Sequence, residues 1–86
     1  MFNIIERFMN KLTIDDVKNF AEKNEVFLSN EELEFTYTFV KKNWQTVLAS
    51  PTSLNIERYQ NMYSPENFEK IKKLIREYSI KYKNYL

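Results

Sequence analysis

Carboxylates, lysines, tyrosines and hydroxyl groups are the side chains that could do chemistry in this chain of 86 residues. The sequence contains no His and no Cys, which excludes Cys–His and Ser–His nucleophilic pairs and the usual zinc sites. It also contains no Gly. Because loops that cradle phosphate need a backbone approach that only Gly permits, P-loops and dinucleotide-binding fingerprints are excluded as well.

Glu31 and Glu34 are the carboxylates whose spacing is most suggestive, because residues three apart share one face of a helix. Metal sites in helical bundles usually add His, or matching acids from a second helix, and no His exists here. Both acids also fall near the start of an expected helix, where carboxylates complement the positive end of the helix dipole. We therefore expect a protein that is not an enzyme and that holds no metal and no cofactor.

Basic residues are concentrated toward the C-terminus, where tyrosines interrupt them. From Pro65 to Leu86 there are six basic and three acidic residues, whereas the other 64 residues hold seven basic and nine acidic ones. Aromatic rings interleaved with cations can stack bases and contact phosphates. The tyrosines also continue an apolar stripe, so a half-buried seam with hydroxyl groups at its rim is the other interpretation. If this segment binds nucleic acid, the candidate contact residues are Lys73, Arg76, Tyr78, Lys81, Tyr82 and Lys83.

The elements that must position these residues are predicted to be helices, since no strand-like alternation of useful length competes. Thr13 with Asp16, and Ser29 with Glu32, match the capping box that starts a helix. We predict an all-α fold, a compact bundle of four to five short helices in a single domain of residues 1–86. The expected helices span residues 2–10, 14–23, 30–43 (with an extension to 48 left open), 51–62 and 65–84.

The N-terminal helix carries an apolar stripe at steps of three and four residues. Its members are Phe2, Ile5, Phe8, Met9 and Leu12. Glu6 and Arg7 stand where a signal peptide needs an unbroken apolar core. No run approaches the ~18 apolar residues needed to cross a bilayer. We expect a cytoplasmic protein with no membrane partner.

Asn is the residue expected to end helices in a chain without Gly, because it enters the left-handed conformation more readily than most residues. Asn10, Asn24 and Asn43 follow or end expected helical segments. We predict that these three residues take the left-handed position.

The third helix is apolar on two faces. Its main stripe contains Leu33, Val40 and Trp44, whereas Phe35 and Phe39 fall on roughly the opposite side at ~100° per residue. If the bundle buries only the main stripe, the two phenylalanines form an exposed pair of the kind that binds a partner protein. If the first and last helices cover both faces, the pair belongs to the core.

Residues 11–34 have a helix–loop–helix shape that some nucleic-acid-binding modules use. Modules of this kind grip phosphate through Lys and Arg near the loop, but here the flanking positions are acidic. These acids are Asp15, Asp16, Glu25, Glu31, Glu32 and Glu34. Their repulsion of phosphate makes this segment a scaffold and makes nucleic acid an unexpected partner.

The arrangement resembles the YqfT-like small proteins of unknown function from Bacillus, Staphylococcus and their relatives. The residues that carry the resemblance are K-L-T-x-D-D-V-x-x-F-A at Lys11–Ala21, L-S-x-x-E at Leu28–Glu32, and the Ser64-Pro65 start of a basic C-terminal helix. The resemblance covers nearly the whole chain. It implies a cytoplasmic bacterial protein with no assigned activity, and it supplies no functional residues.

The function that we expect is that of a non-catalytic protein–protein interaction or adaptor module. Small domains without catalytic groups most often bind other proteins, and Phe35 and Phe39 are the candidate contact residues. The partner is an unidentified protein, and a homodimer through the heptad-like last helix is a further option. Weak nucleic-acid binding through the basic, tyrosine-bearing last helix is the alternative.

Overall fold

The computed structural model describes residues 3–49 and 55–82, and within these ranges the fold is an all-α bundle, as predicted. Its elements are the helices α1 (Asn3–Asn10), α2 (Ile14–Lys23), α3 (Asn30–Ala49) and α4 (Pro65–Tyr82) and the 3₁₀-helix η2 (Ile56–Met62). Helix α2 has the predicted bounds, and α3 takes the longer of the two predicted lengths. The predicted helix 51–62 is a shorter 3₁₀-helix in its described part, and residues 51–54 and 83–84 lie outside the described ranges.

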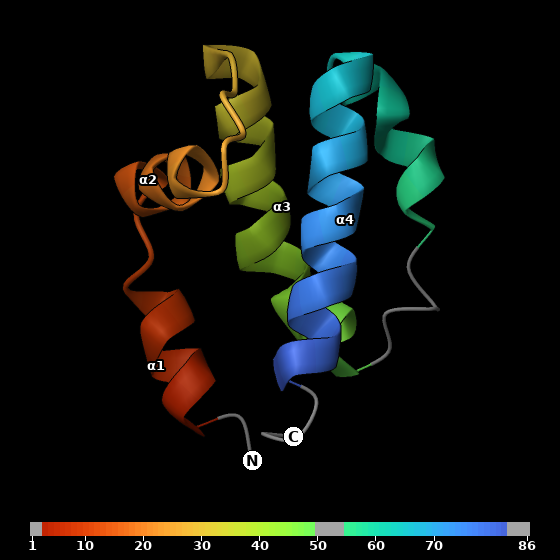
Figure 1. Cartoon of the computed structure of the whole chain (residues 1–86). Coiled ribbons are helices and arrows are strands. Elements are labelled where there is room, and N and C mark those ends of the chain that lie inside the picture. Colours follow the sequence, from red (N-terminus) through yellow and green to blue (C-terminus); the bar gives the residue numbers. More distant parts are fainter. Residues whose placement is uncertain (1–2, 50–54, 83–86) are drawn as a thin grey trace.

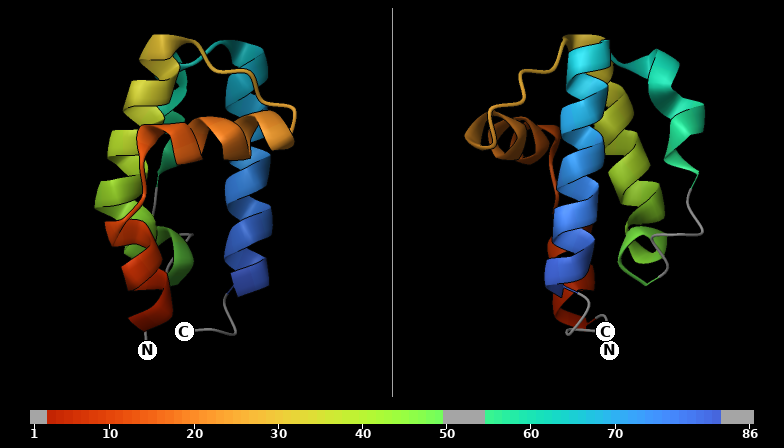
Figure 2. Two further views of the ribbon diagram at one scale, coloured as in Figure 1. Left: turned by 90° about the vertical axis from the view of Figure 1, so that its left-hand side faces the viewer. Right: turned by 45° about the vertical axis from the view of Figure 1, so that its right-hand side comes forward.

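Helix α3 is the central element of the bundle, with α2 and α4 packed against it (Figure 1). Helices α3 and α4 lie roughly side by side, and α2 crosses both of them (Figure 2). Helix α1 lies below α2 at the edge of the molecule in this view. The main cluster of buried side chains consists of Leu12, Val17 and Leu33. This arrangement leaves η2 on the opposite side of the molecule from α1 and α2 (Figure 1).

Both predicted capping boxes form. The Thr13 amide donates to the Asp16 carboxylate at 3.0 Å, and the Asp16 amide donates to the Thr13 hydroxyl oxygen at 3.1 Å. The Ser29 amide donates to Glu32 Oε1 at 2.9 Å, and the Glu32 amide donates to Ser29 Oγ at 3.1 Å. Each box satisfies backbone donors that the first turn of a helix leaves unpaired, which is why α2 and α3 begin where they do.

Helices α1 and α2 end at the predicted residues, Asn10 and Lys23, but the prediction that Asn takes the left-handed position at the helix ends was wrong. Asn24 has φ −100°, and the residue in the left-handed region is Glu25, with φ 62°. The Val26 amide donates to the Ala21 carbonyl oxygen at 2.8 Å and the Glu25 amide to the Glu22 carbonyl oxygen at 3.0 Å, which is the Schellman pattern of a helix end. The apolar pair that accompanies this pattern, Val26 and Ala21, is buried.

The other two asparagines are also not in the left-handed region. Asn10 is the last residue of α1, and Asn43 lies inside α3, where its amide side chain donates to the Phe39 carbonyl oxygen at 3.1 Å. At the end of α2, the left-handed residue is Glu25 and not Asn24 because the buried apolar packing of Val26 fixes where the chain must turn. Glu25 accepts the strained conformation that the turn requires.

Candidate functional site

Phe35 and Phe39 are both half-buried, and η2 is the element that covers them. The ring centroid of Phe35 lies 5.6 Å from that of Tyr59 and 5.7 Å from that of Tyr63, and Phe39 lies 5.1 Å from Tyr59. The described ring contacts to the two phenylalanines thus come from η2 and from Tyr63, the residue after it, and the Tyr63 ring in turn lies 6.3 Å from the Phe68 ring of α4. Whether Phe35 and Phe39 contact a partner protein stays a prediction.

The Tyr63 hydroxyl group ties this aromatic cluster to the start of α3. Thr36 Oγ1 donates to the Glu32 carbonyl oxygen at 2.7 Å, so its single hydrogen is used. The Tyr63 hydroxyl group must therefore donate to Thr36 Oγ1, 2.5 Å away. Burial is the main cause that raises the pKa of Tyr63, and the nearby charge of Glu32 adds to the increase. Tyr63 is therefore a neutral structural donor.

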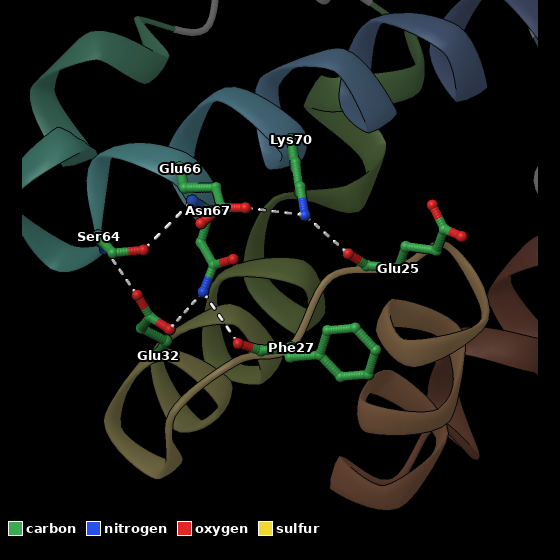
Figure 3. Close-up of polar contacts among 7 residues, drawn as sticks. All are labelled: Glu25, Phe27, Glu32, Ser64, Glu66, Asn67 and Lys70. Atoms are coloured by element: carbon green, nitrogen blue, oxygen red, sulfur yellow. Dashed lines mark hydrogen bonds and ion pairs between the residues drawn. The ribbon is translucent and has the colours of Figure 1, made fainter.

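The Glu32 carboxylate caps two helices at once, and Figure 3 shows its contacts with Ser64 and Asn67 at the start of α4. Besides the Ser29 amide of its own helix, it accepts a hydrogen bond from the Ser64 amide at 2.7 Å through Oε2, and one from Asn67 Nδ2 at 2.9 Å through Oε1. Asn67 Nδ2 also donates to the Phe27 carbonyl oxygen at 3.0 Å. The start of α3, the start of α4 and the loop after α2 thus meet at one carboxylate.

Glu32 is 7% exposed, and the hydrogen bonds decide its charge state. Burial would raise the pKa of the carboxyl group. The amides of Ser29 and Ser64 and the side chains of Asn67 and Ser29 outweigh burial and lower the pKa below the ordinary value of 4.5. A carboxylate with both oxygens engaged by internal donors has a structural role, and we assign it no catalytic one.

Glu31 and Glu34, the carboxylates with metal-like spacing, are both exposed. Within the described residues, no three His, Cys, Asp or Glu side chains gather in a way that could hold a metal ion. Glu31 lies in the first turn of α3, where negative charge stabilises the helix start, and Glu34 follows on the exposed surface.

The basic face of α4 is divided by the helix geometry. At ~100° per residue, Tyr78 lies about 200° around the helix from Arg76 and about 140° from Lys73. The Tyr78 ring packs edge-on against Phe20 of α2 at 5.2 Å, and Lys81 Nζ lies 5.3 Å from the Tyr78 ring centroid. The structure therefore separates Lys73 and Arg76 from the tyrosine that would stack a base. Tyr82 is the last described residue of α4, and Lys83 lies outside the described ranges.

Several cations of α4 are already paired with acids. A depression of about 480 Å³ on this helix is lined by Glu69, Lys70, Lys72, Lys73 and Arg76. The ion pairs around it are Lys70–Glu66 (3.3 Å), Lys72–Glu57 (3.0 Å), Lys72–Glu69 (3.4 Å) and Lys73–Glu77 (3.9 Å). The hydrogen bond with Glu57, aided by the charges of Glu57 and Glu69, raises the pKa of Lys72 against its desolvation. This surface offers phosphate little unneutralised charge.

The outer face of α1 is the surface that sequence reasoning missed. Met9 and Ile5 of the predicted stripe are half-buried and Leu12 is buried, but Phe8 is 62% exposed, and Ile4, one turn before it, is 83% exposed. The spacing predicts Phe8 in the stripe because a residue three from Ile5 is compatible with one face. In the structure, the buried side of α1 is centred on Met9 and Leu12, and Phe8 lies outside it. The signal was present in the four-residue spacing of Ile4 and Phe8.

Helix α1 is nevertheless anchored to the bundle. Lys41 Nζ, from α3, donates to the carbonyl oxygens of Met9 at 2.8 Å and Asn10 at 3.4 Å, which places a cation at the negative end of α1. Tyr37 donates through its hydroxyl group to the Leu12 carbonyl oxygen at 3.1 Å. The contacts hold the helix at its C-terminal end and leave Ile4 and Phe8 facing solvent.

Comparison of the chain with protein-family models, with curated proteins and with solved structures gave no match. The resemblance to the YqfT-like proteins therefore stays a prediction. None of the helices in the described residues combines the length and the apolarity needed to cross a membrane.

Proposed function

We propose that the protein is a non-catalytic protein-interaction module whose docking surface is the outer face of α1. The observation that carries the proposal is the exposure of two large apolar side chains one helical turn apart, Ile4 at 83% and Phe8 at 62%. Such pairs mark partner surfaces, because a partner that covers them removes apolar area from water. A location in the bacterial cytoplasm is part of the proposal and is supported by the resemblance to the YqfT-like proteins.

The setting of α1 supports this role. The Lys41 hydrogen bonds and the packing of Met9 and Leu12 fix the C-terminal end of the helix before a partner arrives. A partner therefore has a smaller ordering cost to meet for this element, which favours binding to a small surface. Helix α1 of eight residues is about 12 Å long, so the matching element of the partner is short.

Affinity capture from the native cell tests the proposal. The tagged wild type would be compared with the double variant Ile4→Ser, Phe8→Ser and with the control Phe27→Ser, which removes a 67% exposed ring from the loop after α2. We expect a protein that the wild type and the control retain and the double variant loses, while circular dichroism shows all three folded. Identical captured sets for the three proteins would contradict the proposal.

A further inference from the structure

The exposed face of α1 is cationic as well as apolar. Ile4, Arg7, Phe8 and Lys11 follow the i, i+3, i+4, i+7 spacing of one helical face, and all four are exposed. Lys11 belongs to this face because its amide donates to the Phe8 carbonyl oxygen at 3.1 Å, which continues the turn beyond Asn10. We call these four residues the α1 stripe.

The two cations of the α1 stripe differ from those of α4. Within the described residues, neither Arg7 nor Lys11 has an acidic group within ion-pair distance, whereas Lys70, Lys72 and Lys73 each have at least one. Glu6, the acid of α1, lies about 200° around the helix from Ile4 and from Phe8. The stripe thus combines exposed apolar area with positive charge that no described group neutralises.

Charge complementarity decides what kind of chain would cover the α1 stripe. A partner that buries Ile4 and Phe8 also brings Arg7 and Lys11 to the rim of the contact, where carboxylates are favourable and cations are repelled. The short length of α1 matches a single amphipathic helix laid along it. Two apolar side chains are too few to anchor the protein to a lipid surface, which makes an anionic membrane the weaker occupant.

We propose, on the basis of the interaction role given above, that the α1 stripe binds an acidic amphipathic polypeptide segment. The apolar side chains of the segment cover Ile4 and Phe8, and its carboxylates pair with Arg7 and Lys11. Electrostatic attraction at the rim selects a partner of negative charge and raises the association rate, while burial of the apolar pair stabilises the complex.

The test uses two labelled peptides and the full chain. Both peptides are designed 18-residue helices with Leu at i, i+3, i+4 and i+7. Their flanking positions are Glu in one peptide and Gln in the other. Fluorescence anisotropy should give the Glu peptide a Kd lower by about fivefold or more, since two rim ion pairs add modestly to binding. Added salt should remove the difference, because exposed charges are screened.

Matched variants locate the effect. Arg7→Gln with Lys11→Gln should abolish the preference for the Glu peptide, whereas Lys18→Gln with Lys42→Gln, which removes two exposed cations from α2 and α3, should keep it. Equal affinity of the wild type for both peptides would overturn the proposal, and so would equal losses in the two double variants.

The remaining occupants give their own results. Tighter binding to vesicles with about 30% phosphatidylserine than to the Glu peptide would overturn the proposal in favour of a membrane surface. Self-association in sedimentation that Arg7→Gln with Lys11→Gln removes would overturn it in favour of a second copy. If Ile4→Ser with Phe8→Ser weakens the binding of both peptides equally while the wild type shows no charge preference, the interaction role stands and the proposal of an acidic partner is wrong. If that variant binds both peptides as tightly as the wild type does, the proposal that the outer face of α1 is the interaction surface is wrong.

Discussion

Glu32 Oε2 accepts a hydrogen bond of 2.7 Å from the backbone amide of Ser64, a residue 32 positions further along the chain. The contact joins the first turn of α3 to the residue before α4. A capping residue ordinarily serves one helix, and here the same carboxylate also receives the Ser29 amide and the Asn67 side chain. The junction therefore fixes how α3 and α4 meet.

Replacement of Glu32 by Gln should destabilise the protein. Every group that reaches this carboxylate is a donor, so one amide hydrogen of Gln would face another donor, either at Ser64 or at Ser29 and Asn67. A buried donor left without an acceptor costs about 1–3 kcal/mol. Urea unfolding of Glu32→Gln and of the control Glu34→Gln, an exposed acid of the same helix, measures the effect. Similar midpoints for the two variants would show that the shared cap contributes little.

The stability of the protein should fall in acid partly through Glu32. Because its pKa is lower in the folded state than the ordinary value of 4.5, the unfolded chain binds the proton more readily. The Glu32 contribution is thus fully present above that ordinary value and is lost as the pH falls through the folded-state pKa. The stability difference between wild type and Glu32→Gln should shrink as the pH falls from above the ordinary value of 4.5 through the folded-state pKa. A difference that stays constant over this range would refute the assignment.

Substitution of Glu25 by Gly should stabilise the protein. At φ 62° a residue with a Cβ carries a steric cost of about 1–2 kcal/mol, which Gly avoids, although Gly also loses more entropy on folding. The expected net gain is about 0.5–1 kcal/mol. The Lys70 Nζ contact uses the carbonyl oxygen of residue 25 and survives the change. Thermal unfolding measures the gain.

The control for that substitution is Glu22→Gly, which removes the same charge from an exposed position inside α2. It should cost up to about 1 kcal/mol, because residue 22 lies in the last turn of α2 and Gly is unfavourable within a helix. Two variants that shift the melting temperature in the same direction would show that the backbone at residue 25 is not strained.

The double change Phe35→Asp with Phe39→Asp should prevent folding. Both rings pack within 6 Å of the Tyr59 ring, so two carboxylates placed there would lose water without gaining partners. The comparison variant Ile4→Asp with Phe8→Asp should keep native circular dichroism, because those side chains face solvent. If Phe35→Asp with Phe39→Asp stays folded and changes oligomeric state, the two phenylalanines form an interface instead.

Local chemistry explains which parts of the fold were predictable. The pairs Thr13–Asp16 and Ser29–Glu32 lie three residues apart, so their hydrogen bonds are set before any tertiary contact forms, and both helix starts were predicted correctly. The Ser64 contact was not predictable, because it depends on how two distant helices pack. Glu25 was missed for a related reason, since packing of Val26 selects the turn against the preference of the side chain.

The candidate surfaces show the same division. The spacing predicted two apolar faces on α3, and in the structure η2 covers the Phe35 face. The 3₁₀ geometry of η2 could not be predicted, because no side-chain capping hydrogen bond marks its start. Spacing in α1 allowed both Phe8 and Ile5 on the buried side, and a helix of eight residues is too short for periodicity to choose between them. Only the placement of α1 beside α3 resolves the choice.

The shared cap at Glu32 also links the motions of two regions that are far apart in sequence. The amides of Ser29 and Ser64 both donate to one carboxylate, so a fluctuation that withdraws it opens both helix starts together. In hydrogen–deuterium exchange these two amides should behave as one cooperative unit, and Glu32→Gln should accelerate both. The N-terminal end of α4 then gains its kinetic protection from α3, whereas α1, which Lys41 anchors at its C-terminal end, has no described hydrogen bond to this cap and should exchange independently of it.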